Sequence, residues 1–135
     1  MALQYSDAVR DAQLDAFETA VGTSAILRIR TGAAPADCAT ADSGTVLVTM
    51  NLPSDWMAAA SGGSKAKSGT WEDTSADATG TAAHFRIYAS NGTTVHAQGT
   101  VTATSGGGDM ELDNTSIASG QTVTVTTFTL SAGNA

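Results

Sequence analysis

The side chains that could carry out chemistry are few in this sequence, and their spacing does not assemble a reactive group. Cys38 stands alone, so neither an internal disulfide nor a cluster of thiolates around a metal can form. Asp109, Glu111 and Asp113 alternate along one expected strand and, with Asn114, offer oxygen ligands of the kind that calcium takes. The segment lacks the glycine and the terminal glutamate of a helix-loop-helix calcium site. We therefore favour a charged strand edge, where carboxylates discourage unwanted pairing.

The histidines and the known catalytic motifs give no active site either. His84 and His96 fall on one face of an expected hairpin, on the order of 13 Å apart at ~3.3 Å per residue and beyond ligand distances of ~2.1 Å. The sequence contains no Gly-x-Ser-x-Gly elbow, phosphate-binding loop with a lysine, His-Glu-x-x-His or paired-cysteine motif. We predict that the protein is not an enzyme and has no catalytic residue, cofactor or metal site.

Length and charge narrow the class of protein. The 135 residues suffice for one domain, which we expect to span residues 1–135. A balance of 13 acidic against 6 basic side chains gives a net charge of -7, which repels phosphate backbones, so no nucleic-acid partner is expected. Asp7 and Asp11 stand where a secretory signal needs an apolar core, and no apolar run approaches the length of a membrane span. We expect a cytoplasmic product without a membrane partner.

One N-terminal helix, about residues 6–21, is the first element that would position these side chains. Ser6 or Asp7 can cap its first turn, and Gly22 can end it. At about 100° per residue, one side of the helix is a wide apolar arc of Val9, Ala12, Leu14, Ala16, Phe17, Ala20 and Val21. The opposite side is an acidic stripe of Asp7, Asp11, Asp15 and Glu18.

The two sides of this helix predict different contacts. No lysine lies four residues from any of the acids, so the acidic stripe is either solvated, which we favour, or met by a basic partner. Arg10 lies beside Phe17, where its stem can cover apolar surface while the guanidinium reaches an acid or a partner chain. The apolar arc is wide for a lone surface helix, so we predict a homo-oligomer, or a monomer that oligomerises on a larger assembly.

Alternating residues predict a β-domain over residues 25–131. Short strands between small-residue loops favour an antiparallel β-sandwich or a jelly-roll-like barrel. In the longest expected strand, residues 121–130, Val123 and Val125 share one parity, whereas Phe128 and Leu130 share the other. A β-bulge at residues 126–127, or a strand that crosses between two sheets, would explain the change of parity.

A hairpin is predicted around the turn signal Asn91-Gly92. A two-residue turn would pair Ile87 with His96, whereas a three-residue loop would pair Ile87 with Ala97. The parity of the apolar residues favours the three-residue loop.

Eight side chains are candidates for a protein interface: Arg10, Phe17, Arg28, Arg30, Trp56, Lys65, Lys67 and Trp71. Arg28 and Arg30 share a face near a strand end, where they either pair with acids of a neighbouring subunit or are simply exposed. Lys65 and Lys67 lie in the glycine- and serine-rich segment 61–69, interpreted as a mobile loop or as an arm that becomes ordered on an acidic neighbour.

The tryptophans carry a hypothesis from another class of protein. Trp56 and Trp71 belong to the core or to an interface in most small β-domains. Together with Tyr88, they also suggest a carbohydrate-binding module, in which aromatic rings stack on a sugar.

Three passages, at residues 1–6, 51–60 and 109–125, resemble small structural proteins of tailed bacteriophages and prophages. The resemblance carries no catalytic motif, so no functional residue is transferred. It implies a virion component that is assembled in the host cytoplasm. The implied function is that of a capsid decoration or cement protein that binds the major capsid protein or other virion subunits. A head-tail connector or a tail component is the alternative.

Overall fold

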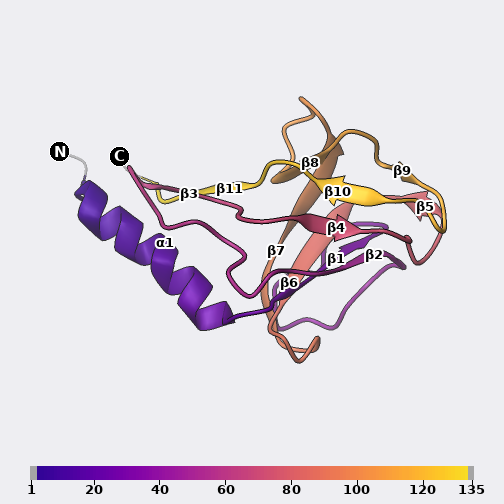
Figure 1. Cartoon of the computed structure of the whole chain (residues 1–135), viewed down its shortest axis with the longest axis horizontal. Helices are drawn as coiled ribbons and strands as arrows, with labels where there is room; N and C mark the ends of the chain where they lie inside the picture. The colour runs from indigo at the N-terminus through magenta and orange to yellow at the C-terminus, as the bar shows by residue number, and fades with distance from the viewer. Residues whose placement is uncertain (1–2, 134–135) are drawn as a thin grey trace.

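The computed structural model describes residues 3–133, so positions 1–2 and 134–135 of the predicted domain lie outside the described residues. The chain is mainly β with one N-terminal helix, which confirms the predicted fold class (Figure 1). In chain order the elements are α1 (Asp7–Val21), β1 (Ile26–Arg30), β2 (Val46–Asn51), β3 (Ser64–Ala66), β4 (Trp71–Asp73), β5 (Gly80–Thr81), β6 (His84–Tyr88), β7 (Val95–Ala103), β8 (Met110–Leu112), β9 (Ser116–Ile117), β10 (Val123–Val125) and β11 (Thr129–Ser131).

The helix α1 begins and ends where its sequence signals predict. Ser6 is the N-cap, and its hydroxyl oxygen accepts a hydrogen bond from the Val9 N–H at 3.3 Å. At the other end Gly22 has a φ of 90°, and its N–H donates to the Glu18 carbonyl at 2.9 Å. Within α1 only Leu14 and Val21 are buried, so most of the predicted apolar arc remains at the surface.

A five-stranded sheet in the order β2-β1-β6-β7-β8 forms the larger layer. Its pairs are antiparallel except for β7 and β8, which run parallel, so the sheet is mixed rather than purely antiparallel. In the hairpin of β6 and β7, Ile87 pairs with Ala97, which confirms the predicted register. The register shifts between Ile87 and Tyr88, so β7 contains an irregularity next to the turn.

A second layer covers the inner face of this sheet. It consists of the antiparallel pairs β4–β10 and β5–β9. Leu27 and Ile29 in β1 and Phe85 in β6 belong to one hydrophobic cluster with Trp71 in β4 and Val125 in β10. The core therefore lies between the two layers, as in a sandwich.

The predicted strand over residues 121–130 is divided into β10 and β11, which pair with β4 and β3 respectively. Trp71 pairs with Val125, and Ala66 pairs with Thr129. The chain advances five residues from Ala66 to Trp71 but only four from Val125 to Thr129, so the extra residue lies between β3 and β4. The predicted bulge at residues 126–127 is therefore misplaced. The alternative, a strand that crosses between two sheets, agrees with the structure, because β10 and β11 belong to different two-stranded sheets. The β3–β11 pair, here called the ribbon, extends from the sandwich toward α1 (Figure 1).

Candidate functional site

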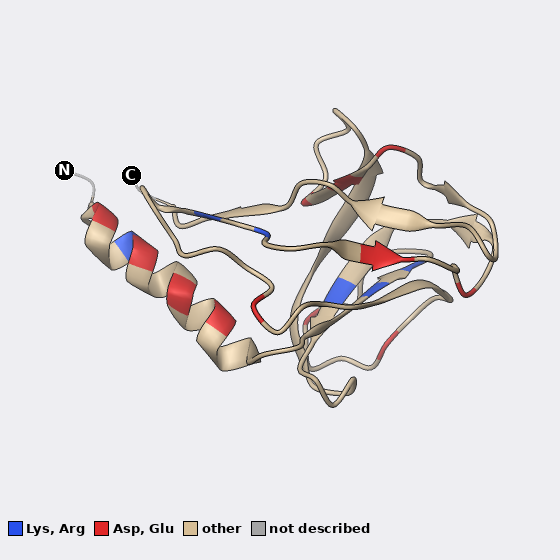
Figure 2. Ribbon diagram, viewed as in Figure 1, with Lys and Arg blue, Asp and Glu red and all other residues tan. Residues whose placement is uncertain are grey.

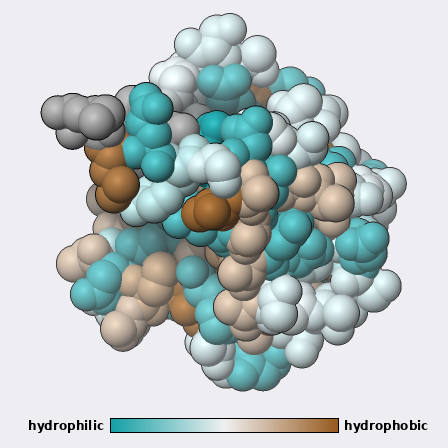
Figure 3. Space-filling model, turned by 90° about the vertical axis from the view of Figure 1, so that its left-hand side faces the viewer, coloured by the Kyte–Doolittle hydropathy of each residue, from teal (hydrophilic) through white to brown (hydrophobic). Residues whose placement is uncertain are grey.

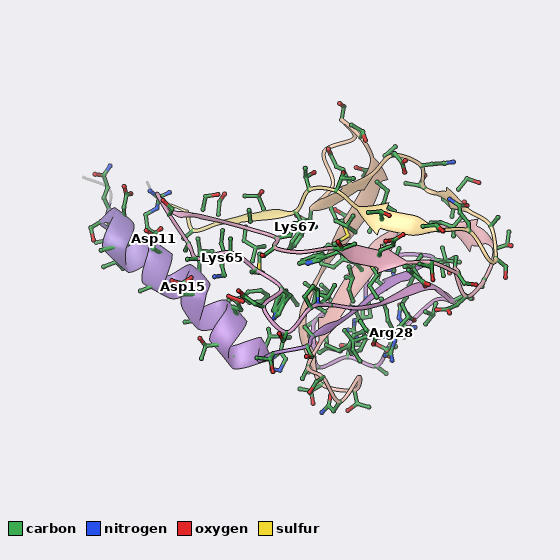
Figure 4. All side chains as sticks on the ribbon, in the orientation of Figure 1. Asp11, Asp15, Arg28, Lys65 and Lys67 are labelled. Atoms are coloured by element: carbon green, nitrogen blue, oxygen red, sulfur yellow. The ribbon has the colours of Figure 1, made fainter. Side chains whose placement is uncertain are left out.

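The helix α1 is attached to the ribbon by a group of polar contacts that we call the latch: Asp11, Asp15, Glu18, Gly63 and Lys65. The Lys65 ammonium lies 2.6 Å from Asp15 Oδ1 and 3.0 Å from Glu18 Oε1. The Gly63 N–H donates to Asp11 Oδ1 at 2.7 Å. Figure 4 shows Lys65 on the ribbon facing Asp15 on α1, and Figure 2 shows acidic positions along α1 and a basic position on the ribbon. Half of the predicted acidic stripe is thus met by the chain's own lysine.

Burial and charge oppose each other in the latch. Lys65 is 2% exposed, and this burial lowers the pKa of its ammonium. The hydrogen bonds and charges of Asp15 and Glu18 outweigh burial, so the pKa of Lys65 is raised above its ordinary value. Hydrogen bonds from Lys65 and from the Ala60 N–H hold the pKa of Asp15 below its ordinary value. The Lys65–Asp15 pair is therefore charged across the neutral range.

The predicted mobile loop of residues 61–69 is wrong for its central part. Lys65 belongs to strand β3 and points into the α1 contact, so it is not a solvated charge. Lys67 is half-buried. Its ammonium donates to the Gly69 carbonyl at 2.7 Å and lies 5.8 Å from the Trp71 ring centroid. The two lysines that look equivalent in the sequence have different structural roles.

Arg10 ties α1 to the end of the ribbon. Its Nε donates to the Ala132 carbonyl at 3.0 Å, and its Nη1 lies 3.0 Å from Asp7 Oδ1. A Cβ atom on Gly63 would overlap the Arg10 guanidinium, so this side chain fills the space beside the glycine. The structure thus places Arg10 in a contact within the chain.

Aromatic rings continue the contact from α1 into the core. Phe17 meets Trp56 edge-on at 5.9 Å between centroids, and Trp71 lies 6.0 Å from Trp56. Phe128 follows at 5.5 Å from Trp71, and Phe85 at 5.7 Å from Phe128. These rings connect α1 through both layers of the sandwich.

The burial of the aromatic side chains overturns the residues chosen for sugar stacking. Trp56, Trp71 and Tyr88 are each 0% exposed, so none presents a ring face to a ligand. The Trp56 indole donates to the Gly22 carbonyl at 2.9 Å, and the Trp71 indole to the Trp56 carbonyl at 3.1 Å. Their polar atoms are satisfied inside the fold, as expected for core tryptophans.

The two arginines of β1 share the outer face of the sheet, as predicted, but Arg30 is not exposed. Arg30 is 7% exposed and lies 3.0 Å from Asp42 Oδ2. Arg28 donates to the Gly92 carbonyl at 2.8 Å and lies 4.7 Å from the Tyr88 ring centroid. Both side chains therefore have partners within the chain.

A buried polar network that the sequence did not indicate pins the segment 32–45 onto this outer face. Arg86 is 1% exposed and lies 2.7 Å from Asp42 Oδ1, and it also donates to Gln98 and to loop carbonyls. Burial raises the pKa of Asp42, but hydrogen bonds from Tyr88 and Arg86 and the nearby Arg30 charge outweigh it and lower this pKa. The alternation of Phe85 and Ile87 places Arg86 on the outer face, but no local signal shows that a distant loop covers it.

Two surface features remain at the α1 end. On the outer side of the helix, Val9 is 43% exposed and Ala12, Ala16 and Ala20 are exposed. On the inner side, a groove of about 630 Å³ lies between α1, the sheet and β11. Figure 3 faces this end of the molecule and shows hydrophobic side chains beside a hollow in the surface.

Across residues 3–133, no three His, Cys, Asp or Glu side chains gather in a way that could hold a metal ion. The one helix of this described part is not long and apolar enough to cross a membrane. Comparison of the chain with protein-family models, with curated proteins and with solved structures gave no match.

Proposed function

We propose that the protein is a non-enzymatic structural subunit of a tailed-bacteriophage virion, namely a capsid decoration or cement protein that binds the major capsid protein and stabilises the head. The observation that carries the proposal is the outer face of α1, where small and apolar side chains are exposed on a well-packed body. The described basic side chains have partners within the chain, so the proposed contact with other subunits is assigned to the outer face of α1 and not to these charges. The resemblance of three sequence passages to phage structural proteins supplies the setting.

The outer face of α1 suits close contact with a second copy, so the proposed subunit forms a homo-oligomer or becomes one on the capsid. Ala12, Ala16 and Ala20 follow one another at four-residue spacing and therefore lie on one side of the helix. Val9 extends this surface toward the N-terminal end of α1. An exposed apolar strip of this kind loses contact with water when another subunit covers it.

The test is the composition of virions produced with variants of this face. In the Ala12→Glu, Ala16→Glu variant, the introduced charges remain solvated in the monomer but would be desolvated in an interface. Occupancy on purified virions should fall by at least about tenfold, while thermal unfolding of the monomer stays nearly unchanged. A matched control, Ser90→Glu with Ala118→Glu, adds the same charge at exposed positions elsewhere and should keep full occupancy.

The outcome also locates the protein in the particle. Quantitative mass analysis of separated heads and tails should find it on heads, in a fixed ratio to the major capsid protein. Its absence from virions would refute the proposed class, and its presence only on tails would replace decoration with the tail alternative.

A further inference from the structure

The two sides of the five-stranded sheet, at β2 and at β7, differ in how far their outward-pointing backbone groups are covered. At the β2 edge, the Thr49 N–H donates to Asp73 Oδ2 at 3.0 Å, and the Leu47 carbonyl accepts from the Asp77 N–H at 2.7 Å. These contacts occupy an N–H and a C=O that point away from the sheet in the middle of β2. The β2 edge is therefore covered at its centre.

The β7 edge is closed over only part of its length. β8 pairs with Val101–Ala103, although β7 begins at Val95. The Val101 N–H donates to the Ala83 carbonyl at 2.9 Å, so the backbone groups of the odd-numbered residues near it point toward β6. Because the direction alternates along a strand, the backbone N–H and C=O of Gln98 point away from β6. The Thr100 N–H is taken by Asp109 Oδ2 at 2.9 Å. In the part of β7 that β8 does not cover, β6 is the neighbouring strand, and the backbone N–H and C=O of Gln98 point away from it.

A second open edge belongs to β11. The Lys67 N–H donates to the Phe128 carbonyl at 2.9 Å, and the Ala132 N–H to the Gly63 carbonyl at 3.0 Å. Even-numbered positions of this strand thus face β3, and Thr129 and Ser131 direct their backbone groups away from it. Both residues are exposed.

These two open edges border the same groove. Its wall includes Gln98 of β7 together with Thr129 and Ser131 of β11, and its apolar lining includes Leu14 and Phe17 of α1. Backbone donors and acceptors next to an apolar floor are what an extended peptide requires when it adds to a sheet. A globular ligand would leave the strand edges unused.

The charges beside the groove select the type of segment. Asp109 lines the groove, and Glu111 lies in the adjoining hollow. Their carboxylates accept hydrogen bonds from Thr100 and Gly107, but neither has a cationic partner among residues 3–133. A lysine or arginine at one end of the bound segment would supply the missing charge.

A second copy of this chain does not offer such a segment. Of its basic side chains in the described part, Arg10, Arg30, Lys65 and Arg86 are in ion pairs. Arg28 and Lys67 lie over aromatic rings and donate to backbone carbonyls. The complementary charge must therefore come from another protein.

We propose that the groove between β7, β11 and α1 binds an extended segment of another protein as an added β-strand, with alternating apolar residues on the groove floor and a basic residue beside Asp109 and Glu111. The segment hydrogen-bonds to the backbone of Thr129, Ser131 and Gln98. The strand edges and the charges are features of the isolated chain, so the groove can bind such a segment outside a virion as well.

A synthetic peptide that alternates valine with threonine and carries lysines at one end is the probe. It should bind the full chain in calorimetry and slow hydrogen exchange at the amides of Gln98, Thr129 and Ser131. N-methylation of alternate peptide amides should weaken binding by at least about tenfold, because a methylated amide cannot donate to a strand edge. A peptide with glutamates in place of the lysines should bind at least about tenfold more weakly.

Two variants test the protein side. Asp109→Asn with Glu111→Gln keeps the hydrogen-bond acceptors but removes the charge, so it should lower affinity and abolish its dependence on salt. Ser131→Pro removes an amide that points away from β3 and costs no hydrogen bond of the ribbon, so folding is kept while binding falls. Equal binding of the N-methylated peptide, absent protection of these amides, or no binding of the lysine peptide would each overturn the proposal. Protection of the same amides by self-association of the chain would replace the partner with a second copy.

Discussion

Lys65 shows how a single residue connects the two parts of the molecule. Its ammonium is almost fully buried, yet both of its carboxylate partners retain some exposure, 50% for Asp15 and 23% for Glu18. Burying a charge is unfavourable unless ion pairs and hydrogen bonds compensate for lost hydration, and here the acidic stripe of α1 supplies them. The position of α1 is thus specified by charge as well as by apolar contact.

Replacing Lys65 with methionine should lower the free energy of unfolding by about 1–2 kcal/mol. Charged hydrogen bonds contribute more than this when fully buried, but partial exposure of the two carboxylates reduces the loss. The matched control, Lys67→Met, should change stability by less than about 0.5 kcal/mol, because its ammonium donates to an exposed carbonyl and lies at the long distance of 5.8 Å from the Trp71 ring centroid. Urea denaturation of both variants measures the difference, and equal losses would mean that the latch does not hold α1.

Residue roles could be predicted only where the partner is close in sequence. The cap at Ser6 and the Ile87–Ala97 pair follow from local patterns, and both are present. Lys65 and Arg86 differ, because their partners Asp15 and Asp42 are 50 and 44 positions away. Nothing in a single sequence distinguishes a lysine that meets such a distant acid from a solvated one.

The contact between α1 and the ribbon gives a prediction at the scale of elements. Gly63→Ala places a Cβ against the Arg10 guanidinium and should displace this side chain from the Ala132 carbonyl. Gly62→Ala is a matched control, because φ is also positive, 61° against 78°, but no atom lies near its added Cβ. Both variants carry about 1 kcal/mol of backbone strain, so the additional loss in Gly63→Ala reports the α1 contact. Indistinguishable thermal unfolding of the two variants would remove Arg10 from that contact.

The division of residues 121–130 into β10 and β11 has a packing consequence. The break turns Phe128 into the core, where its ring lies 5.5 Å from that of Trp71, although its parity differs from that of Val125. Sequence parity therefore located the irregularity, but the extra residue lies in the partner segment, which has no alternating pattern of its own. The structure of a small-residue segment such as 61–70 is therefore set by the strand with which it pairs, here β11.

Phe128→Ala should accordingly be among the most damaging substitutions in this segment. It removes a ring that contacts both layers and leaves a cavity, at a cost of about 3–5 kcal/mol. Leu130→Ala, at a half-buried position of β11, should cost less than half as much. Chemical denaturation compares the two, and a larger loss for Leu130→Ala would place the centre of the core in the ribbon rather than in the sandwich.

At the scale of the whole molecule, a sandwich and an α1–ribbon end are held together by a latch that titrates at both ends of the pH range. The pKa of Asp15 is lowered from 3.8, so its contribution is present above pH 3.8 and is lost as the pH falls through the lower folded value. The pKa of Lys65 is raised from 10.5, so its contribution is present below pH 10.5 and is lost as the pH rises through the higher folded value. Asp42 in the outer-face network also has a lowered pKa, so acid weakens both regions.

The latch can be separated from that network by comparing the wild type with two variants across pH. The difference in unfolding free energy between the wild type and Lys65→Met should be constant from pH 3.8 to 10.5 and should shrink on both sides, because the Asp42 contribution cancels. The same difference for Arg86→Met should shrink only in acid, since an arginine keeps its charge throughout this range and Asp42 does not. Urea titrations with tryptophan fluorescence follow both differences, because Trp56 packs against Phe17 of α1 and Trp71 lies in the core. If the free-energy difference between the wild type and Lys65→Met does not shrink at high pH, the ammonium is not what holds α1 on the ribbon. The aromatic contact between Phe17 and Trp56 would then have to hold α1 in place.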